Sequence, residues 1–250
     1  MYPDNRAIYN DNWQFWLDMK LHGPASRWLR FLIRSQINRI QNPGRIESIL
    51  DVGCGEGTIT HALATWLRHA RVVGIDFSAQ GIHYAELRYK RSNLEFIHDE
   101  DSDQLKRHYD LVTAFEVLEH VDRWSDFLDR IANSARRFIL LSFPTRNMRP
   151  FEKVMGHYRN FQPGEVEQFM LERSFKPISL FYAGFPFYSP LYRDFCNLSH
   201  SVMKSYVRGN YGLSKRIASQ IVYCSFRFFS TKHRFGDQFC GLFARTTQKS

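Results

Sequence analysis

The chain has 250 residues, enough for one large α/β domain with an insertion. No apolar run approaches the roughly 18 residues that span a bilayer. We expect no secretory signal, because no basic segment precedes an apolar one at the amino terminus. The four cysteines are scattered without a C-x-x-C pair, which argues against a disulfide scaffold or a zinc ribbon. A cytoplasmic location is therefore expected.

The formal net charge of +9 is concentrated in the last part of the chain. Residues 1–175 hold 23 basic and 23 acidic side chains, whereas residues 176–250 hold 11 basic and 2 acidic ones. The basic part is also rich in Phe and Tyr. Such a segment suits nucleic acid, an anionic membrane surface or an anionic substrate. A solvated positive face is an equally simple interpretation.

Residues 1–45 are predicted to be helical, since Trp13, Trp16, Trp28 and other apolar side chains recur at helical spacing, with a break at Gly23-Pro24. Strand and helix patterns alternate from residue 48 onward. Strands are predicted over 48–52, 71–75, 94–97, 110–115, 137–143, 177–183 and 238–244, and helices over 58–69, 79–90, 124–134 and 164–173. This alternation indicates βαβ units and a doubly wound parallel sheet, whose ligands bind beyond the carboxyl ends of the strands.

A long segment separates the last two predicted strands. Loops of that length are uncommon in compact domains, the stretch 184–190 is too rich in Gly and Pro for regular structure, and residues 191–230 have a mostly helical, amphipathic pattern. We therefore interpret 184–234 as an inserted cap. It combines eleven Phe and Tyr with eight basic and one acidic side chain.

The most informative segment is 49–58, where an apolar strand ends in Asp51 and is followed by Gly53, Gly55 and Gly57. Such a turn lets the backbone approach a ligand closely. Its G-x-G-x-G spacing differs from the dinucleotide fingerprint G-x-G-x-x-G, and it lacks the Gly-Lys-Ser/Thr ending of a phosphate P-loop. The acid before the first glycine suits a cationic or hydroxyl-bearing ligand better than a pyrophosphate.

This segment resembles motif I of the class I S-adenosylmethionine-dependent methyltransferases. The resemblance covers roughly 45–183 and 238–246. It implies a Rossmann-like, seven-stranded sheet with a helical insertion before the last strand, and S-adenosylmethionine as the cofactor, with Asp51 near its amino group. The methyltransferase core is then 46–183 with 235–250, the inserted basic aromatic cap is 184–234, and the helices of 1–45 cover the active site.

Asp76 ends the second predicted strand, 25 residues after Asp51, and matches the family's ribose-binding acid. A carboxylate can accept two hydrogen bonds from a ribose diol; a helix N-cap is the alternative role, although Ser78 suits it better. By resemblance Phe77 flanks the adenine, Asp99 binds its amino group and Glu100 offers a backbone N–H, unless 99–103 is only a solvated acidic turn. The implied cofactor site comprises Asp51, Gly53, Cys54, Gly55, Asp76, Phe77, Asp99, Glu100 and Phe115.

The sequence Glu116-Val117-Leu118-Glu119-His120 follows the fourth strand. Its E-x-x-E-H form resembles both the O-methyltransferases of ubiquinone biosynthesis and the small-RNA 3′-terminal 2′-O-methyltransferases. The RNA enzymes bind a divalent cation through two glutamates and two histidines, which here implies Glu116, Glu119, His120 and His157 around Mg²⁺, Mn²⁺ or Zn²⁺. Without a metal, His120 is a candidate general base. A purely structural role for the segment is the third interpretation.

These observations predict methyl transfer to a hydroxyl of a hydrophobic small molecule, such as a phenol, quinone precursor, polyketide or lipid-linked intermediate, with His120 and His157 in the catalytic site. The alternative is an RNA 2′-O-methyltransferase that uses the cap as its RNA platform. No RRM-type motif supports it, so nucleic acid is not the expected partner. The basic cap also suits peripheral contact with an anionic membrane. A non-catalytic binding protein is disfavoured by the intact motifs.

Overall fold

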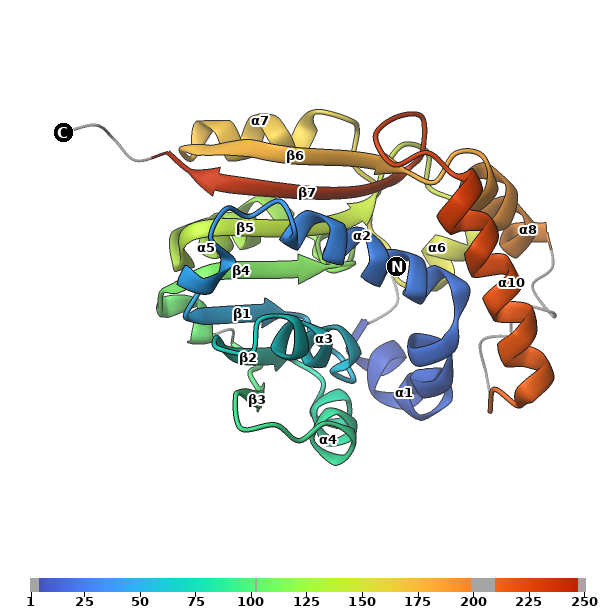
Figure 1. The fold of residues 1–250 in the computed structure, drawn as a ribbon, viewed down its shortest axis with the longest axis horizontal. Helices are drawn as coiled ribbons and strands as arrows, with labels where there is room; N and C mark the ends of the chain where they lie inside the picture. Colours follow the sequence, from blue (N-terminus) through green and yellow to red (C-terminus); the bar gives the residue numbers. More distant parts are fainter. Residues whose placement is uncertain (1–4, 102, 199–209, 247–250) are drawn as a thin grey trace.

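A seven-stranded sheet in the order β3-β2-β1-β4-β5-β7-β6 forms the centre of the molecule (Figure 1). The computed structural model describes residues 5–101, 103–198 and 210–246. Strands β1 to β5 pair in parallel, whereas β7 runs antiparallel to both β5 and β6. The predicted doubly wound sheet is therefore confirmed. The strands are β1 Ser48–Val52, β2 Arg71–Asp76, β3 Leu94–His98, β4 Tyr109–Phe115, β5 Ala135–Pro144, β6 Phe175–Ala183 and β7 Gln238–Arg245.

Helices cover both faces of the sheet, because successive strand residues point to opposite sides. In β1, Ile49 belongs to the core formed with α2 and α3, and Leu50 to the core formed with α5 and α7. A fully buried aliphatic side chain contributes about 1.5–3 kcal/mol, so these two cores hold the sheet in place. The helices around the sheet are α2 Pro24–Ile37, α3 Thr58–Trp66, α4 Ala79–Arg88, α5 Trp124–Ser134 and α7 Glu165–Glu172.

A second group of helices lies beyond the carboxyl ends of the parallel strands, on the right in Figure 1. It contains α1 Asn5–His22, α6 Pro150–Val154, the irregular turn η4 Phe187–Tyr192, α8 Arg193–Leu198 and α10 Leu213–Phe229. The segments η4, α8 and α10 lie between β6 and β7, as the predicted helical insertion requires. The part of that prediction over 199–209 lies outside the described residues.

The break between α1 and α2 has a steric cause. The Gly23 N–H donates to the Met19 carbonyl at 2.7 Å, and a Cβ on Gly23 would lie only 2.4 Å from that oxygen. Any larger residue would therefore displace the end of α1. Pro24 then starts α2 at a position where a missing N–H costs nothing.

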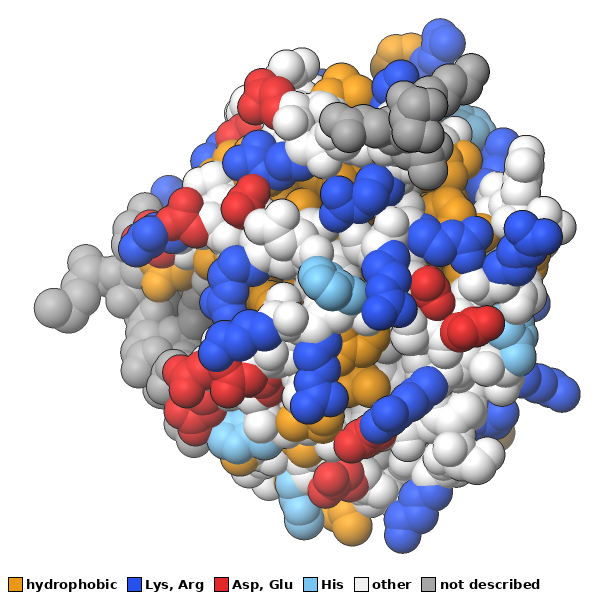
Figure 2. Space-filling view, turned by 90° about the vertical axis from the view of Figure 1, so that its left-hand side faces the viewer, with side chains coloured by type: hydrophobic (Ala, Val, Ile, Leu, Met, Phe, Trp, Pro, Cys, Tyr) orange, Lys and Arg blue, Asp and Glu red, His pale blue; other side chains and the backbone are white. Residues whose placement is uncertain are grey.

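Several boundaries differ slightly from the sequence-based expectation. The helices expected over 58–69 and 79–90 end earlier, at Trp66 and Arg88. The five-residue helix α6 was not expected, because so short a segment carries no periodic signal. No helix among the described residues is long and apolar enough to cross a membrane. On the side of the molecule that is left in Figure 1, Lys and Arg are interspersed with Asp and Glu (Figure 2).

Candidate cofactor and active site

A cavity of about 740 Å³ opens at the carboxyl ends of the parallel strands. Its walls come from segments far apart in the sequence: the glycine turn after β1, the end of β2, the turn after β4, the loop after α6, helices α1 and α2, and η4 with α8. The volume is in the range of small-molecule and cofactor sites. Every residue expected in the cofactor, catalytic or metal sites lines this cavity, with the exception of Asp51.

The glycine turn after β1 needs glycine for two reasons. Gly53 and Gly55 have φ of 72° and 54°, a region that side chains with a Cβ rarely adopt. There is also no space for a Cβ: on Gly53 it would lie 2.4 Å from Val117 Cγ2, and on Gly55 2.3 Å from Trp13 Cη2. The turn thus lies directly beneath α1, with its backbone exposed to the cavity.

Asp76 joins the glycine turn to the end of β2. Its carboxylate accepts hydrogen bonds from the Gly55 N–H and the Ser78 N–H, both at 2.8 Å. Burial raises the pKa of Asp76, and these two hydrogen bonds oppose that shift. The N-cap role goes to Ser78, whose hydroxyl accepts from the Gly81 N–H. Asp76 is therefore a fixed acceptor at the cavity wall, with lone pairs left for a ligand.

The remaining expected cofactor residues surround this acid. Asp99 lines the cavity, but its two carboxylate oxygens already accept the backbone N–H groups of Asp103 and Gln104 at the start of the short helix η2 Asp103–Lys106. The acidic turn thus has a structural role as well as a place in the cavity. Also in the lining are Gly53, Cys54, Gly55, Phe77, Glu100 and Phe115.

Asp51 differs from the expectation. Its carboxylate is turned into the fold, where it accepts hydrogen bonds from the hydroxyls of Thr60 and Thr113, both at 2.7 Å. Only 2% of the residue is exposed, and burial raises its pKa to about 6. Asp51 therefore supports the glycine turn from below and does not reach the cavity. Sequence patterns miss this because both threonines come from other elements.

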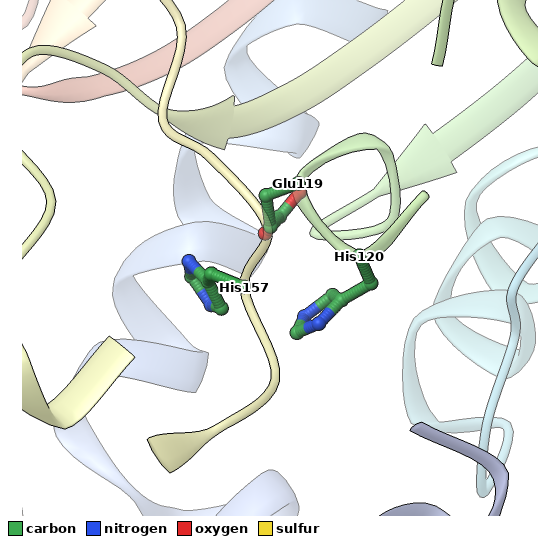
Figure 3. Close-up of side chains that lie close together, drawn as sticks. All are labelled: Glu119, His120 and His157. Carbon is green, nitrogen blue, oxygen red and sulfur yellow. The ribbon is translucent and has the colours of Figure 1, made fainter. Parts of the chain in front are cut away.

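Three polar side chains meet on the opposite wall of the cavity. Ligand atoms of Glu119, His120 and His157 all lie within 4.8 Å of one another. Figure 3 shows Glu119 and His120 on the turn after β4 and His157 on the loop that follows α6. The two segments are joined by a hydrogen bond from the Tyr158 N–H to the Glu119 carbonyl, at 2.8 Å. We call these three residues the Glu-His-His cluster.

The electrostatics of this cluster are unusual. The Glu119 side chain is fully buried, and neither of its carboxylate oxygens has a hydrogen-bond partner among the described residues. Burial, and then the nearby Glu116, raise its pKa well above the usual range. Burial lowers the pKa of His120 to about 3 and that of His157 to about 4, so both imidazoles are neutral near pH 7. Buried neutral imidazoles beside an unpartnered carboxyl group are suited to bind a cation.

Glu116 does not join the cluster. Its carboxylate accepts hydrogen bonds from Ser142 Oγ and Gln238 Nε2, both at 2.8 Å, although it also lines the cavity. Its backbone has φ of 55°, which is uncommon for a residue with a side chain. The expected four-ligand set is therefore reduced to three, because Glu116 points toward β5 and β7.

A buried polar network holds His157 in position. The Oδ1 atom of Asn160 lies 3.4 Å from Nδ1 of His157. The Nδ2 group of Asn160 donates a hydrogen bond to the Glu152 carboxylate at 3.0 Å. Glu152 is also bound by Arg193 of α8, which in turn lies 2.8 Å from Asp237 at the start of β7. The charges of this network are paired, as buried charges must be. The insertion thereby contacts the loop that carries His157.

Comparisons with known proteins agree with this architecture. Residues 50–137 match the family model described as a methyltransferase domain. Similar curated proteins include the mitochondrial ubiquinone biosynthesis O-methyltransferase of Schizosaccharomyces pombe, 34% identical over 114 residues (43% of this chain, 40% of that protein). A malonyl-[acyl-carrier protein] O-methyltransferase of Acetivibrio thermocellus is 31% identical over 111 residues (44% and 39%). The match spans about two fifths of each of these two relatives.

The fold extends the similarity over the whole chain. The magnesium protoporphyrin IX methyltransferase of Synechocystis PCC 6803, solved with bound SAH, superposes with a TM-score of 0.62 at 17% identity, covering 96% of this chain and 98% of that one. Residues 50–137 therefore belong to a class I S-adenosylmethionine-dependent methyltransferase domain. The sheet order with antiparallel β7 is that of this fold.

The methyltransferase cavity fits the cofactor's chemistry. Its glycine turn leaves backbone exposed, Asp76 offers a carboxylate for a ribose diol, and the wall carries several acids that favour a sulfonium cation. The acids in the lining are Glu56, Asp76, Asp99, Glu100, Glu116, Glu119, Asp122 and Glu152.

Sequence reasoning missed Lys20 of α1 as a cavity residue of the methyltransferase. Lys20 lines the cavity, and its positive charge lowers the pKa values of Asp76 and Glu119 on opposite walls. Among the described residues its ammonium forms no ion pair, and it lies 5.8 Å from the centroid of the Trp13 ring. An isolated Lys near the end of a helix carries little signal of such a role in the sequence.

Proposed function

We propose that this methyltransferase transfers a methyl group from S-adenosylmethionine to a hydroxyl of a hydrophobic small molecule: a phenol, quinone precursor, polyketide or lipid-linked intermediate. One observation carries the proposal. The Glu-His-His cluster faces the same cavity as the glycine turn and Asp76. A cofactor held by the turn and an acceptor held by the cluster would then share one enclosed space.

The chain's own residues divide the work of cofactor binding. Asp76 would accept hydrogen bonds from the ribose hydroxyls, while Phe77, Asp99 and Glu100 would form the adenine end of the site. Lys20, whose positive charge acts on acids of both walls, would pair with the carboxylate of the methionine part. The bound cofactor supplies a methyl group on a sulfonium, which is a good leaving group, so the protein needs mainly to align the acceptor.

The acceptor end of the cavity is largely aromatic and apolar. Its lining includes Phe151, Met155 and Tyr158 from the region of α6, and Tyr188 and Tyr192 from the insertion. Apolar walls with a few polar groups are typical of small-molecule sites. The two curated relatives are named as O-methyltransferases, which supports an oxygen acceptor. The cavity favours a small acceptor, and these names favour an oxygen acceptor other than RNA.

The Glu-His-His cluster would activate the acceptor hydroxyl. We propose that it binds a divalent cation, since a carboxylate with two neutral imidazoles is a suitable ligand set for Mn²⁺ or Zn²⁺, and with water for Mg²⁺. The fit rests on Glu119, whose buried oxygens have no partner among the described residues. A cation there would lower the pKa of a bound hydroxyl. His120 acting alone would be a weak base, because its pKa of about 3 is far below neutral pH.

A transfer assay with methyl-labelled cofactor tests this function. Purified protein should label catechols or related phenols, lose activity with a chelator and regain it with Mn²⁺, Zn²⁺ or Mg²⁺. His120→Ala should lower turnover on the order of a hundredfold and leave cofactor affinity unchanged. His108→Ala is the matched control, since His108 is exposed and outside the cavity. Full activity in His120→Ala would exclude both roles of His120, and labelled RNA in place of phenols would contradict the acceptor class.

A further inference from the structure

The solvent-facing side of α10 carries a row of exposed apolar side chains. Leu213, Ile217, Ile221 and Phe228 share one side of the helix and are 77%, 53%, 66% and 70% exposed. The opposite side buries Phe226, which packs against Tyr188 and Tyr192. Surface helices normally turn their polar residues to water. We call the four exposed residues the α10 stripe; an apolar surface of this kind marks a contact with another body.

Exposed aromatic side chains extend the stripe at the carboxyl end of α10. The Phe229 ring lies 5.9 Å from that of Phe187, and the Phe235 ring lies 6.2 Å from that of Phe185. All four of these rings are exposed. We call them the Phe cluster. Like the stripe, they present exposed apolar side chains, here at the carboxyl end of α10 and beside η4.

Positive charge borders this surface. Arg216 and Arg227 lie on α10, and Lys232 and Arg234 follow it. The sequence has no acidic residue between Asp194 and Asp237. Those two acids are themselves occupied, since Arg149 pairs with both of them at 2.7 Å. The surface is therefore apolar in its middle and cationic at its border.

We propose that the α10 stripe and the Phe cluster dock on an anionic lipid membrane, with α10 lying along the surface. Apolar side chains insert into the interfacial region, and each nearby cation is attracted to anionic headgroups. A nucleic acid would use the cations but not the exposed aliphatic residues. A second copy of the chain would bring like charges together. An anionic membrane matches both properties of the surface.

The docking surface adjoins the cavity. Tyr188 and Tyr192 line the cavity and pack on Phe226, on the side of α10 opposite the stripe. A hydrophobic acceptor dissolved in the bilayer would therefore enter from this side. That consequence rests on the proposed function, whereas the docking itself does not.

Vesicle flotation with the full chain tests the docking. The probes are vesicles of one part phosphatidylglycerol to two parts phosphatidylcholine, and vesicles of phosphatidylcholine alone. The protein should float with the anionic vesicles and stay behind with the neutral ones. Ile217→Ser/Ile221→Ser should weaken partitioning at least tenfold, which is about 1.4 kcal/mol. Leu87→Ser/Leu171→Ser is the matched control, since these residues are also exposed but lie on α4 and α7.

Two charge variants complete the test. Lys232→Gln/Arg234→Gln should weaken binding to anionic vesicles. Arg68→Gln/Arg107→Gln is the control: it removes the same charge from exposed positions elsewhere in the chain and should leave the binding unchanged. Three results would overturn the proposal: no flotation with anionic vesicles, equal flotation of the stripe variant and the wild type, or a dimer in solution that the stripe variant converts to a monomer. Cofactor binding is measured in every variant, so loss of folding or of the proposed function is distinguished from loss of docking.

Discussion

At the scale of single residues, two acids that the sequence treats alike have different roles. Asp76 faces the cavity and holds the glycine turn by a hydrogen bond to Gly55, whereas Asp51 accepts from Thr60 and Thr113 inside the fold. Both follow an apolar strand, so the sequence alone cannot separate them. What separates them is the position of the threonine hydroxyls, which only the packed sheet brings together.

The buried Asp51 predicts a defined pH dependence of stability. Its pKa is raised from 3.8 to about 6 in the folded protein, so the folded state binds the proton more tightly than the unfolded state. Protonated Asp51 therefore stabilises the folded state, fully so below the pKa that Asp51 has in the unfolded chain. This stabilisation, about 3 kcal/mol, is lost as the pH rises through about 6. The free energy of unfolding of the wild type and of Asp51→Asn is measured with denaturant at steps between about pH 4 and about pH 7. The wild type should lose stability relative to the variant as pH rises; parallel pH profiles would contradict the assignment.

At the scale of elements, α1 packs directly on the glycine turn. Trp13 donates from Nε1 to Ser78 Oγ at 3.1 Å, and its ring fills the space above Gly55. Trp16 stacks edge-on against it, with the ring centroids 5.7 Å apart. Because both indoles also line the cavity, we expect α1 to cover the bound cofactor.

Removal of one indole tests that role. Trp13→Ala should weaken binding of S-adenosylhomocysteine about tenfold, since a large aromatic contact with the turn is lost. Phe15→Ala is the matched control: Phe15 lies on the same helix, is partly exposed and is outside the cavity lining. Calorimetry of both variants gives the answer. Equal affinities in Trp13→Ala and Phe15→Ala would show that α1 has no part in cofactor binding.

Most elements of the sheet were predictable, because alternating apolar strands and amphipathic helices leave a strong local signal. The strand 48–52 and the helix 124–134 agree with the structure to the residue. The three-residue composition of the Glu-His-His cluster was not predictable. It depends on the left-handed backbone at Glu116, which turns that side chain toward Ser142 and Gln238, residues of two other strands.

At the scale of the whole molecule, the insertion and the amino-terminal helices form one assembly over the cavity. The Tyr211 N–H donates to Asp18 at 2.8 Å, and Ser219 Oγ donates to the His22 carbonyl. These contacts join α1 to residues almost two hundred positions away in the sequence. Among the described residues, the basic side chains Lys215, Arg216, Arg227, Lys232 and Arg234 lie on or just after α10, at the end of the molecule away from the mixed-charge side (Figures 1 and 2).

The central claim is that the glycine turn and Asp76 bind the methyltransferase cofactor in this cavity. Isothermal calorimetry with S-adenosylhomocysteine, on the purified full chain and on Asp76→Ala, tests it most directly. We predict saturable binding at one site by the wild type, and affinity lower on the order of a hundredfold in the variant, because hydrogen bonds to a charged acceptor are lost. Absence of binding by the wild type, or unchanged affinity in Asp76→Ala, would contradict the claim.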